Sequence, residues 1–389
     1  MTCSIREAYV RFKTKYPDVS LSLRNFYSLR PKWVSISHVR EGCVCSCCAN
    51  FELTTITAIN NSEDDLSVCS ITSMCVCEES SEACLSGVCR NCPGTEALTA
   101  QSLGLPEDEE IELATWESGG LVKRTLSVSE FVDILRKWVG SYITHDYIRK
   151  VQREAIRQEK CAVKPGIVVF HFDFSENWTI ILPQEIQSYH WHKTQISIFT
   201  CVVTTSKGAQ SFAVVSDDTR HDSAAALFAL RKIEEHIEEN GPLYGSAVYV
   251  SDGASSHFKN RYQHFGMGFN KAIKTWIFSA PGHGKNACDS VGGVVKHAAT
   301  TYNLRCKTAD VILNAAAFTN TVSKRTPNVT LLHLPTDEVR EYRRRKLDEW
   351  KGVRPVLGLR SCYVWEKPET TSKTVTIKSM QKVGSHMYL

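Results

Sequence analysis

Residues 166–173 read Gly-Ile-Val-Val-Phe-His-Phe-Asp. An apolar run of this length, rich in β-branched and aromatic residues, predicts a buried strand that ends at Asp173. After it, further strands are expected at 178–182, 195–204, 211–216, 247–252 and 275–279. Helices are expected from Asp222 to about 239, at about 255–271 and at 287–299. A hairpin meander followed by a βαβα order predicts an α/β layer fold with a mixed sheet.

The flanking segments predict further domains. Ser127 and Glu130 form a capping-box pattern at the start of a long helix that reaches about residue 158. Residues 99–120, with an acidic run at 106–110, have the composition of a linker. The predicted organisation is a helical segment with a candidate helix-turn-helix at 1–34, a cysteine-rich module at 35–98, an acidic linker and long helix at 99–160, a catalytic core at 161–305 and a basic C-terminal extension at 306–389. A charged helix at 336–350 and short strands within 353–378 are expected in that extension.

The composition is that of a folded, water-exposed protein. Of the 389 residues, 42% are hydrophobic and 23% are charged, which argues against disordered and fibrous classes. No run approaches the 18 apolar residues of a membrane span, and the first residues lack the apolar stretch of a secretory signal. We therefore expect an intracellular protein, with no membrane among its partners.

The cysteines concentrate in one segment. Ten of the 16 fall between residues 43 and 92, and in a reducing compartment this density indicates metal binding before it indicates disulfides. The two Cys-x-x-Cys pairs are the predicted zinc ligands Cys45, Cys48, Cys89 and Cys92. A second zinc site could be completed by Cys75, Cys77 and Cys84, while His38 and Cys43 remain further candidates. The alternatives are unligated thiols, a redox-labile module or a protein-binding module.

Positive charge concentrates at the C-terminal end. Residues 306–389 hold 15 Lys and Arg against 8 Asp and Glu, a local +7 in a chain whose net charge is +4. The densest run is Arg343-Arg344-Arg345-Lys346. Such a patch fits a polyanion, and we expect the three arginines to contact phosphates. The alternative is a solvent-facing helix on which they pair with Glu338, Glu341 and Glu349.

Three aspartates stand at the ends of predicted elements. Asp173 and Asp252 each end a strand, and Asp289 lies in the first turn of the last core helix, with 36 residues between it and Asp252. If the two strands are neighbours, all three carboxylates lie at one edge of the sheet. Their repulsion would be relieved by Mg²⁺ or Mn²⁺, because such hard cations prefer carboxylate oxygens. Two such ions would support phosphodiester chemistry.

This pattern resembles the RNase H-like core of DDE/D transposases and integrases. The segments Asp173-Phe174-Ser175-Glu176-Asn177, Ser251-Asp252-Gly253-Ala254-Ser255 and 283–296 resemble, more narrowly, transposon-derived animal proteins with a cysteine-rich segment ahead of the core. The resemblance covers residues 161–305 well and the N-terminal region loosely. It implies an RNase H-like fold, Mg²⁺ or Mn²⁺ held by Asp173, Asp252 and Asp289 as catalytic residues, and cleavage and joining of DNA strands. The third acidic residue is Asp where many transposases have Glu, and Glu176 is an alternative on a different element.

The implied partner is double-stranded DNA, at transposon ends, and the implied setting is a homo-oligomer in the nucleus. His283, Lys285 and Lys296 lie near the third aspartate and are expected to contact the DNA phosphates. The loop at 282–285 lacks the first Gly and the final Ser or Thr of a phosphate-binding loop, which excludes nucleotide triphosphate binding. Two other functions stay open: a catalytically silent DNA- or chromatin-binding protein that keeps the fold, and a nuclease that acts on RNA–DNA hybrids.

Overall fold

The computed structural model describes residues 9, 12–17, 19–29, 45–79, 81–161, 163–183, 185–191, 193–270, 272–367 and 375–378. The chain divides into two compact units, Met1–Val44 and Cys45–Leu389. In the first unit, residues 12–15 are helical and α2 spans Leu23–Ser28. The Phe12 and Phe26 rings lie 5.3 Å apart and join these two short helices. The two predicted helices are present, and the helix-turn-helix interpretation stays a prediction.

The second unit begins with a cysteine-rich module built on a long helix. Its helices are α3 (Ser46–Asn61), α4 (Val68–Ser73), α5 (Glu82–Leu85), η1 (Thr95–Ala97), η2 (Gln101–Leu103) and α6 (Val128–Cys161). The capping box predicted at the start of α6 is confirmed, since the backbone N–H of Ser127 donates to the Glu130 carboxylate at 3.0 Å. Phe131 and Leu135 on α6 are fully buried in the module's own apolar core, against Phe51 of α3.

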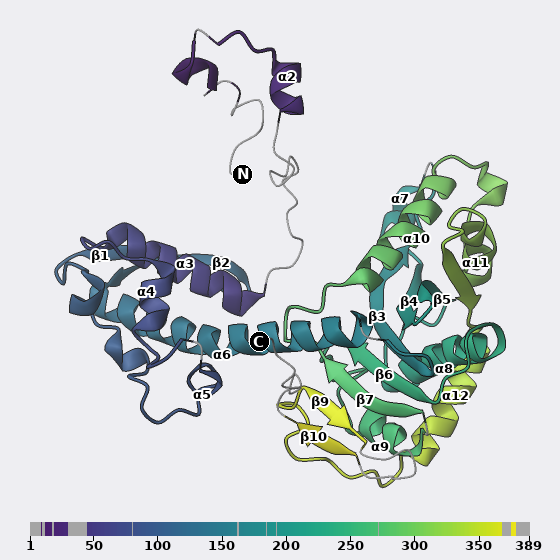
Figure 1. Cartoon of the computed structure of the whole chain (residues 1–389). Helices are drawn as coiled ribbons and strands as arrows, with labels where there is room; N and C mark the ends of the chain where they lie inside the picture. Colours follow the sequence, from purple (N-terminus) through teal and green to yellow (C-terminus); the bar gives the residue numbers. More distant parts are fainter. Residues whose placement is uncertain are drawn as a thin grey trace. The chain divides into compact units, whose positions relative to one another are not determined.

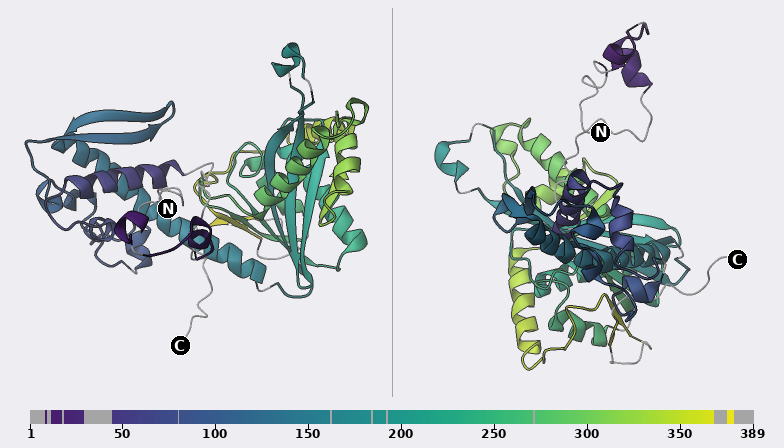
Figure 2. Two further views of the ribbon diagram at one scale, coloured as in Figure 1. Left: turned by 90° about the horizontal axis from the view of Figure 1, so that it is seen from above. Right: turned by 90° about the vertical axis from the view of Figure 1, so that its left-hand side faces the viewer.

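The linker expected at 99–120 is wrong. The second half of this segment and the residues after it form the antiparallel hairpin β1 (Glu110–Glu117) and β2 (Gly120–Ser127), seen in the left view of Figure 2. Ile111 and Leu113 alternate with exposed acidic residues along β1 and are buried in the module's core. Most of the acidic run at 106–110 precedes β1, and only Glu110 of that run joins the solvent face of the strand. The alternation of period two in the residues that follow was the signal that composition obscured.

An eight-stranded mixed sheet forms the rest of the second unit (Figure 1). In spatial order it runs β10 (Thr376–Lys378), β9 (Val364–Glu366), β7 (Ile273–Phe278), β6 (Ser246–Ser251), β3 (Ile167–Thr179), β4 (Gln195–Thr205), β5 (Gly208–Ser216) and β8 (Val329–His333). Strands β3, β6 and β7 are parallel to one another, and β3, β4 and β5 form the antiparallel meander. The predicted strands at 166–173 and 178–182 are one strand, β3, with an irregularity between Ser175 and Trp178.

Helices cover both faces of this sheet. Helices α8 (Ser223–Asn240), α9 (Arg261–Phe269) and α12 (Thr336–Glu349) pack on one face, and α10 (Ala287–Asn303) and α11 (Ala315–Ser323) pack on the other. The short helices α7 (Gln187–His190) and η3 (Thr308–Asp310) lie in connections. Phe170 and Phe172 of β3 point into the first of these layers, while Ile196 and Ile198 of β4 point into the second. The mixed α/β sheet expected from the sequence is confirmed.

Contrary to expectation, the described residues of 306–389 do not form a separate C-terminal extension. Strand β8 pairs with β5, β9 pairs with β7, and α12 packs on α8, so this segment completes the sheet at both edges and covers one of its faces. The expected charged helix and short strands are present, but they belong to the core. The error lies in the boundary, because local charge says nothing about which strands a segment pairs with.

Candidate functional site

The three aspartates predicted as a group come from neighbouring elements. Asp173 lies on the central strand β3, and Asp252 follows the last residue of β6. The parallel pairing of β3 with β6 ends at His171 and Val250, two residues before each aspartate, and the charge of Asp252 acts on Asp173. Asp289 is in the first turn of α10, which packs on the face of the sheet that carries Asp173.

The electrostatics of Asp173 link the three carboxylates. Burial, together with the negative charges of Asp252 and Asp289, raises the pKa of Asp173 to about 7. Burial disfavours the ionised form, and nearby like charges disfavour it further. A divalent cation would reverse both effects, so the charge distribution fits such an ion.

Two of these three carboxylates accept hydrogen bonds from nearby backbone N–H groups. Asp252 accepts the backbone N–H of Ala254 through Oδ1 at 3.1 Å, and Asp289 accepts that of Asn286 through Oδ2 at 2.7 Å in a capping box. Among the described residues, two sets of potential metal ligands have all their ligand atoms within 4.8 Å of one another, and both sets contain cysteines. The three carboxylates are therefore farther apart than this distance. Asp289 is exposed, and the group therefore opens to solvent.

Close packing of α10 on β3 determines where Asp289 lies. A Cβ atom on Gly292 would stand 2.4 Å from the Ser175 Oγ and 2.9 Å from its Cβ, whereas one on Gly293 would meet nothing within 4 Å. Lys296, one turn further, donates to the backbone carbonyl of Glu176 at 3.3 Å. Lys285 is exposed on the loop before the helix, so the two lysines predicted to contact DNA lie on and just before the helix that carries Asp289. Glu176 itself is exposed on β3.

His283 lies in a different cluster from the one predicted. Its Nε2 is 3.0 Å from Nε2 of His145 on α6 and 3.3 Å from Sγ of Cys48 at the start of α3. The Cys45 Sγ lies 3.3 Å from Nε2 of His145, so the four ligand atoms form one compact set. Burial is the main cause that lowers the pKa of both histidines, which favours the neutral imidazole that binds metals. The assignment of His283 to phosphate contact is corrected by this geometry, since its ring faces thiols.

Four further cysteines of the module form a second set. The Sγ of Cys77 lies 3.3 Å from that of Cys84, 3.7 Å from that of Cys89 and 3.8 Å from that of Cys92. Four thiolates at tetrahedral spacing are a structural zinc site, and this set could bind such a metal. Gly87 has a φ of +77°, which lets the chain turn between Cys84 and Cys89. All the described cysteines are free thiols.

The pairing of cysteines therefore differs from the expectation in two respects. Cys75 is not in either set: it is buried in the module's apolar core, and its Sγ donates to the carbonyl of Ile71 at 3.6 Å. Cys77 and Cys84 join Cys89 and Cys92, while Cys45 and Cys48 join two histidines. His38 and Cys43 lie outside the described residues. Sequence reasoning missed His145, because nothing within its own helix has ligand spacing to it.

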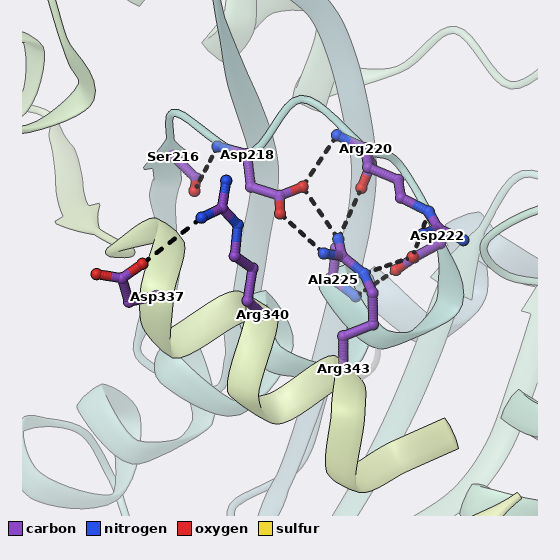
Figure 3. Close-up of polar contacts among 8 residues, drawn as sticks. All are labelled: Ser216, Asp218, Arg220, Asp222, Ala225, Asp337, Arg340 and Arg343. Carbon is purple, nitrogen blue, oxygen red and sulfur yellow. Dashed lines mark hydrogen bonds and ion pairs between the residues drawn. The ribbon is translucent and has the colours of Figure 1, made fainter. Parts of the chain in front are cut away.

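Arg343 is a structural residue in this fold (Figure 3). It is only 9% exposed and donates from Nη1 and Nη2 to the two oxygens of Asp218, at 2.8 and 3.0 Å, and from Nε to Asp222 at 2.7 Å. Burial alone would raise the pKa of Asp218, but the hydrogen bonds from Arg343 hold it below its ordinary value. Its expected contact with DNA phosphate is thus corrected, because its donors are already used inside the protein.

The other basic residues of α12 lie on its solvent face. Arg344 pairs with Glu341 at 2.8 Å, Arg345 lies 3.9 Å from the same carboxylate, and Lys346 pairs with Glu349 at 2.7 Å. This is the charged helix face weighed as the alternative. Exposed pairs of this kind contribute about 0–1 kcal/mol, so Arg344 and Arg345 can exchange a carboxylate for a phosphate at little cost.

Two family profiles match the sequence. Residues 152–380, more than half of the chain, match a family described as a domain of unknown function, DUF8701. The chain belongs to that family. The DUF8701 match begins within α6 and ends after β10, so it spans all eight strands of the sheet. Residues 1–38 match a second such family, DUF8699. No curated protein and no solved structure matches the sequence. Across the described part of the chain, none of the helices has the length and apolar character needed to cross a membrane.

Proposed function

We propose that the DUF8701 core of this chain is an RNase H-like, metal-dependent polynucleotidyl transferase that cleaves and joins DNA strands as transposases do. The observation that carries the proposal is the grouping of Asp173 with Asp252 and Asp289: burial, and then the charges of these two carboxylates, raises the pKa of Asp173 to about 7. Three carboxylates from a central strand, its parallel neighbour and a following helix are costly to assemble without a cation, and Mg²⁺ or Mn²⁺ removes that cost.

The order of the central strands supports the proposed fold. Strands β5, β4, β3, β6 and β7 lie side by side, with the antiparallel meander on one side of β3 and the parallel strands on the other. This order places the end of β6 next to the middle of β3, which brings the first two carboxylates near each other. The third then depends on how closely α10 approaches β3, which Gly292 makes possible.

The residues have separate proposed roles. Asp173, Asp252 and Asp289 would hold the divalent ions, which supply charge neutralisation and activation of the attacking oxygen in phosphodiester chemistry. Lys285 lies just before α10 and Lys296 within it, and both would bind the phosphates next to the scissile bond. Arg344 and Arg345 would add non-specific phosphate contacts, and their removal should flatten the salt dependence of DNA binding by about two log–log units.

The decisive experiment measures strand nicking of duplex DNA by the full chain with Mg²⁺ or Mn²⁺. We expect nicking by the wild-type chain, and none by Asp252→Asn. The matched control is Asp65→Asn, because Asp65 is an exposed aspartate in a loop of the cysteine-rich module. Equal nicking by the wild type and Asp252→Asn would contradict the proposal, and cleavage confined to RNA–DNA hybrids would identify a nuclease instead.

One observation favours a second candidate, a DNA- or chromatin-binding protein that has lost catalysis. Asp289 uses a carboxylate oxygen to cap its own helix, and the three carboxylates are wider apart than a preformed ligand set. In this case the wild-type chain binds DNA with the expected salt dependence and does not nick it, and Asp252→Asn binds DNA equally well.

A further inference from the structure

Four potential metal ligands come together from segments far apart in the sequence. Cys45 and Cys48 lie at the start of α3, His145 lies in the middle of α6, and His283 lies in the loop at 279–286 that precedes α10. The first two elements belong to the cysteine-rich module, and the loop connects β7 with α10 beside the carboxylates. The set therefore joins the module to the sheet at one point.

We propose that Cys45, Cys48, His145 and His283 bind one structural zinc ion, and that this ion holds the 279–286 loop against α3 and α6. With Zn–S near 2.3 Å and Zn–N near 2.0 Å, a tetrahedral ion separates S and N ligands by about 3.5 Å and two N ligands by about 3.3 Å. Here Cys45 to His145 and Cys48 to His283 are each 3.3 Å, the two nitrogens are 3.0 Å apart, and all four ligand atoms lie within 4.8 Å of one another. These three separations are thus within about 0.3 Å of the edges of a zinc tetrahedron.

The ligand types favour zinc and a neutral centre. Two thiolates and two imidazoles are a standard tetrahedral zinc set, and their two negative charges cancel the charge of the ion. A neutral centre can lie near the acidic group without adding repulsion to it. Beside the site, Asp146 of α6 pairs with both Arg149 and Lys150, so this group of side chains adds no negative charge near the ion.

The loop is shaped to approach the cysteines. Gly282 has a φ of +74°, and a Cβ atom there would stand 2.9 Å from the Cβ of Cys45 and 3.1 Å from its Sγ. Only glycine satisfies both the backbone conformation and the close approach. This contact is independent of the histidine and supports the same placement of the loop.

The same loop determines the surroundings of two of the carboxylates. A Cβ on Gly284 would lie 3.2 Å from the Cβ of Asp252, and the backbone N–H of Asn286 caps the Asp289 carboxylate. A ligand at residue 283 therefore fixes a segment that contacts both aspartates within three residues. The zinc site itself does not depend on whether those aspartates perform catalysis.

Elemental analysis of the purified full chain tests the metal. Relative to the wild type, His145→Ala and His283→Ala should each lose one zinc ion per chain, and His333→Ala, at an exposed histidine, should lose none. Because His145→Ala could unfold, His145→Cys is the conservative variant: it should keep the wild-type zinc content. Its cobalt-substituted form should show a stronger thiolate-to-metal absorption band than the wild type, because a third thiolate joins the site. Unchanged zinc in His145→Ala, or an unchanged cobalt band in His145→Cys, would overturn the proposal.

Hydrogen exchange tests the restraint on the loop. Amides of the 279–286 loop should exchange at least tenfold faster in His145→Ala, although the substitution lies on another element. In Cys84→Ser, which alters the four-cysteine set, exchange in the loop should stay at the wild-type rate. Equal exchange in the wild type and His145→Ala would show that no ion holds the loop. Neither measurement uses DNA or Mg²⁺, so a failure here is distinct from a failure of the proposed nuclease.

Discussion

The free energy of unfolding depends on pH through Asp173 of the central strand β3, because its carboxylate is buried near those of Asp252 and Asp289. Its pKa in the folded chain, about 7, is above the ordinary value, so the folded state binds this proton more tightly than the unfolded state does. Stability from this proton is complete at low pH and is lost as the pH rises toward 7. The ionised form at neutral pH is tolerated only at the expense of folding free energy.

Asp173→Asn should therefore stabilise the chain in the absence of added divalent cations. The gain should grow by about 1–2 kcal/mol from pH 5.5 to pH 8, since one pKa unit corresponds to about 1.4 kcal/mol. Urea unfolding at the two pH values measures it, with Asp65→Asn as the exposed control. Added Mg²⁺ should raise the melting temperature of the wild type and leave that of Asp173→Asn unchanged. A variant that is less stable than the wild type at pH 8 would contradict the coupling of the carboxylates.

At this scale the sequence predicted the aspartates and missed His145. Asp173 and Asp252 both follow apolar runs, which is why the pattern singled them out. The expectation that Asp173 ends a strand was wrong, because β3 continues to Thr179, whereas Asp252 does follow the last residue of β6. His145 becomes significant only when α6, α3 and the loop at 279–286 meet. Arg343 is a second example. Its basic neighbours in the sequence suggested that it is exposed to solvent, whereas its side chain pairs with Asp218 inside the protein.

Helix α10 packs closely on β3 because Gly292 has no side chain. Its two adjacent glycines reduce intrinsic helix stability equally, but only Gly292 faces the strand, against Ser175. Close packing of the helix on the sheet is therefore due to one of the two glycines.

Gly292→Ala and Gly293→Ala should have opposite effects. The first forces a Cβ into Ser175 and should destabilise the chain by about 1–3 kcal/mol, whereas the second should stabilise it by about 0.5–1 kcal/mol through helix propensity. Chemical unfolding of both variants measures the difference. Similar effects of the two substitutions would mean that α10 does not pack on β3 at Gly292.

Helix α12 is held to the loop before α8 by an ion pair that is inaccessible to solvent. Arg343→Ala leaves Asp218 buried without its partner and should cost about 3–5 kcal/mol. Arg344→Ala, one residue along on the exposed face, should change stability by less than about 0.5 kcal/mol. Thermal unfolding of the two variants checks the contrast. A cost at Arg343 no larger than that at Arg344 would be inconsistent with the buried network.

Over the whole molecule, the sheet is closed at both edges by the last third of the chain. The sequence predicted the five central strands and their helices, since each has a clear local pattern. It did not predict that β8 and β9 pair with them, because pairing between distant segments leaves no local signal, and a charge excess suggested a separate domain.

A chain ending at residue 305 should consequently fail to fold, although that was the expected end of the core. It lacks β8, β9 and α12, which exposes two strand edges and the apolar surface of α8. A chain of residues 1–378 should unfold cooperatively and remain monodisperse. Soluble yield and a thermal unfolding transition distinguish the two, and a cooperative transition in the shorter chain would contradict the role of these strands.

The late position of β9 also affects how the chain is made. During synthesis β7 is complete at residue 278, yet its partner begins at Val364. At about 5–20 residues per second, the ribosome needs on the order of 4–17 s to supply that partner. Throughout this interval an apolar strand has an open edge on the nascent chain, and neighbouring nascent chains can pair with it. The rate of translation from residue 279 to residue 364 therefore influences how much of the newly made protein reaches the native state.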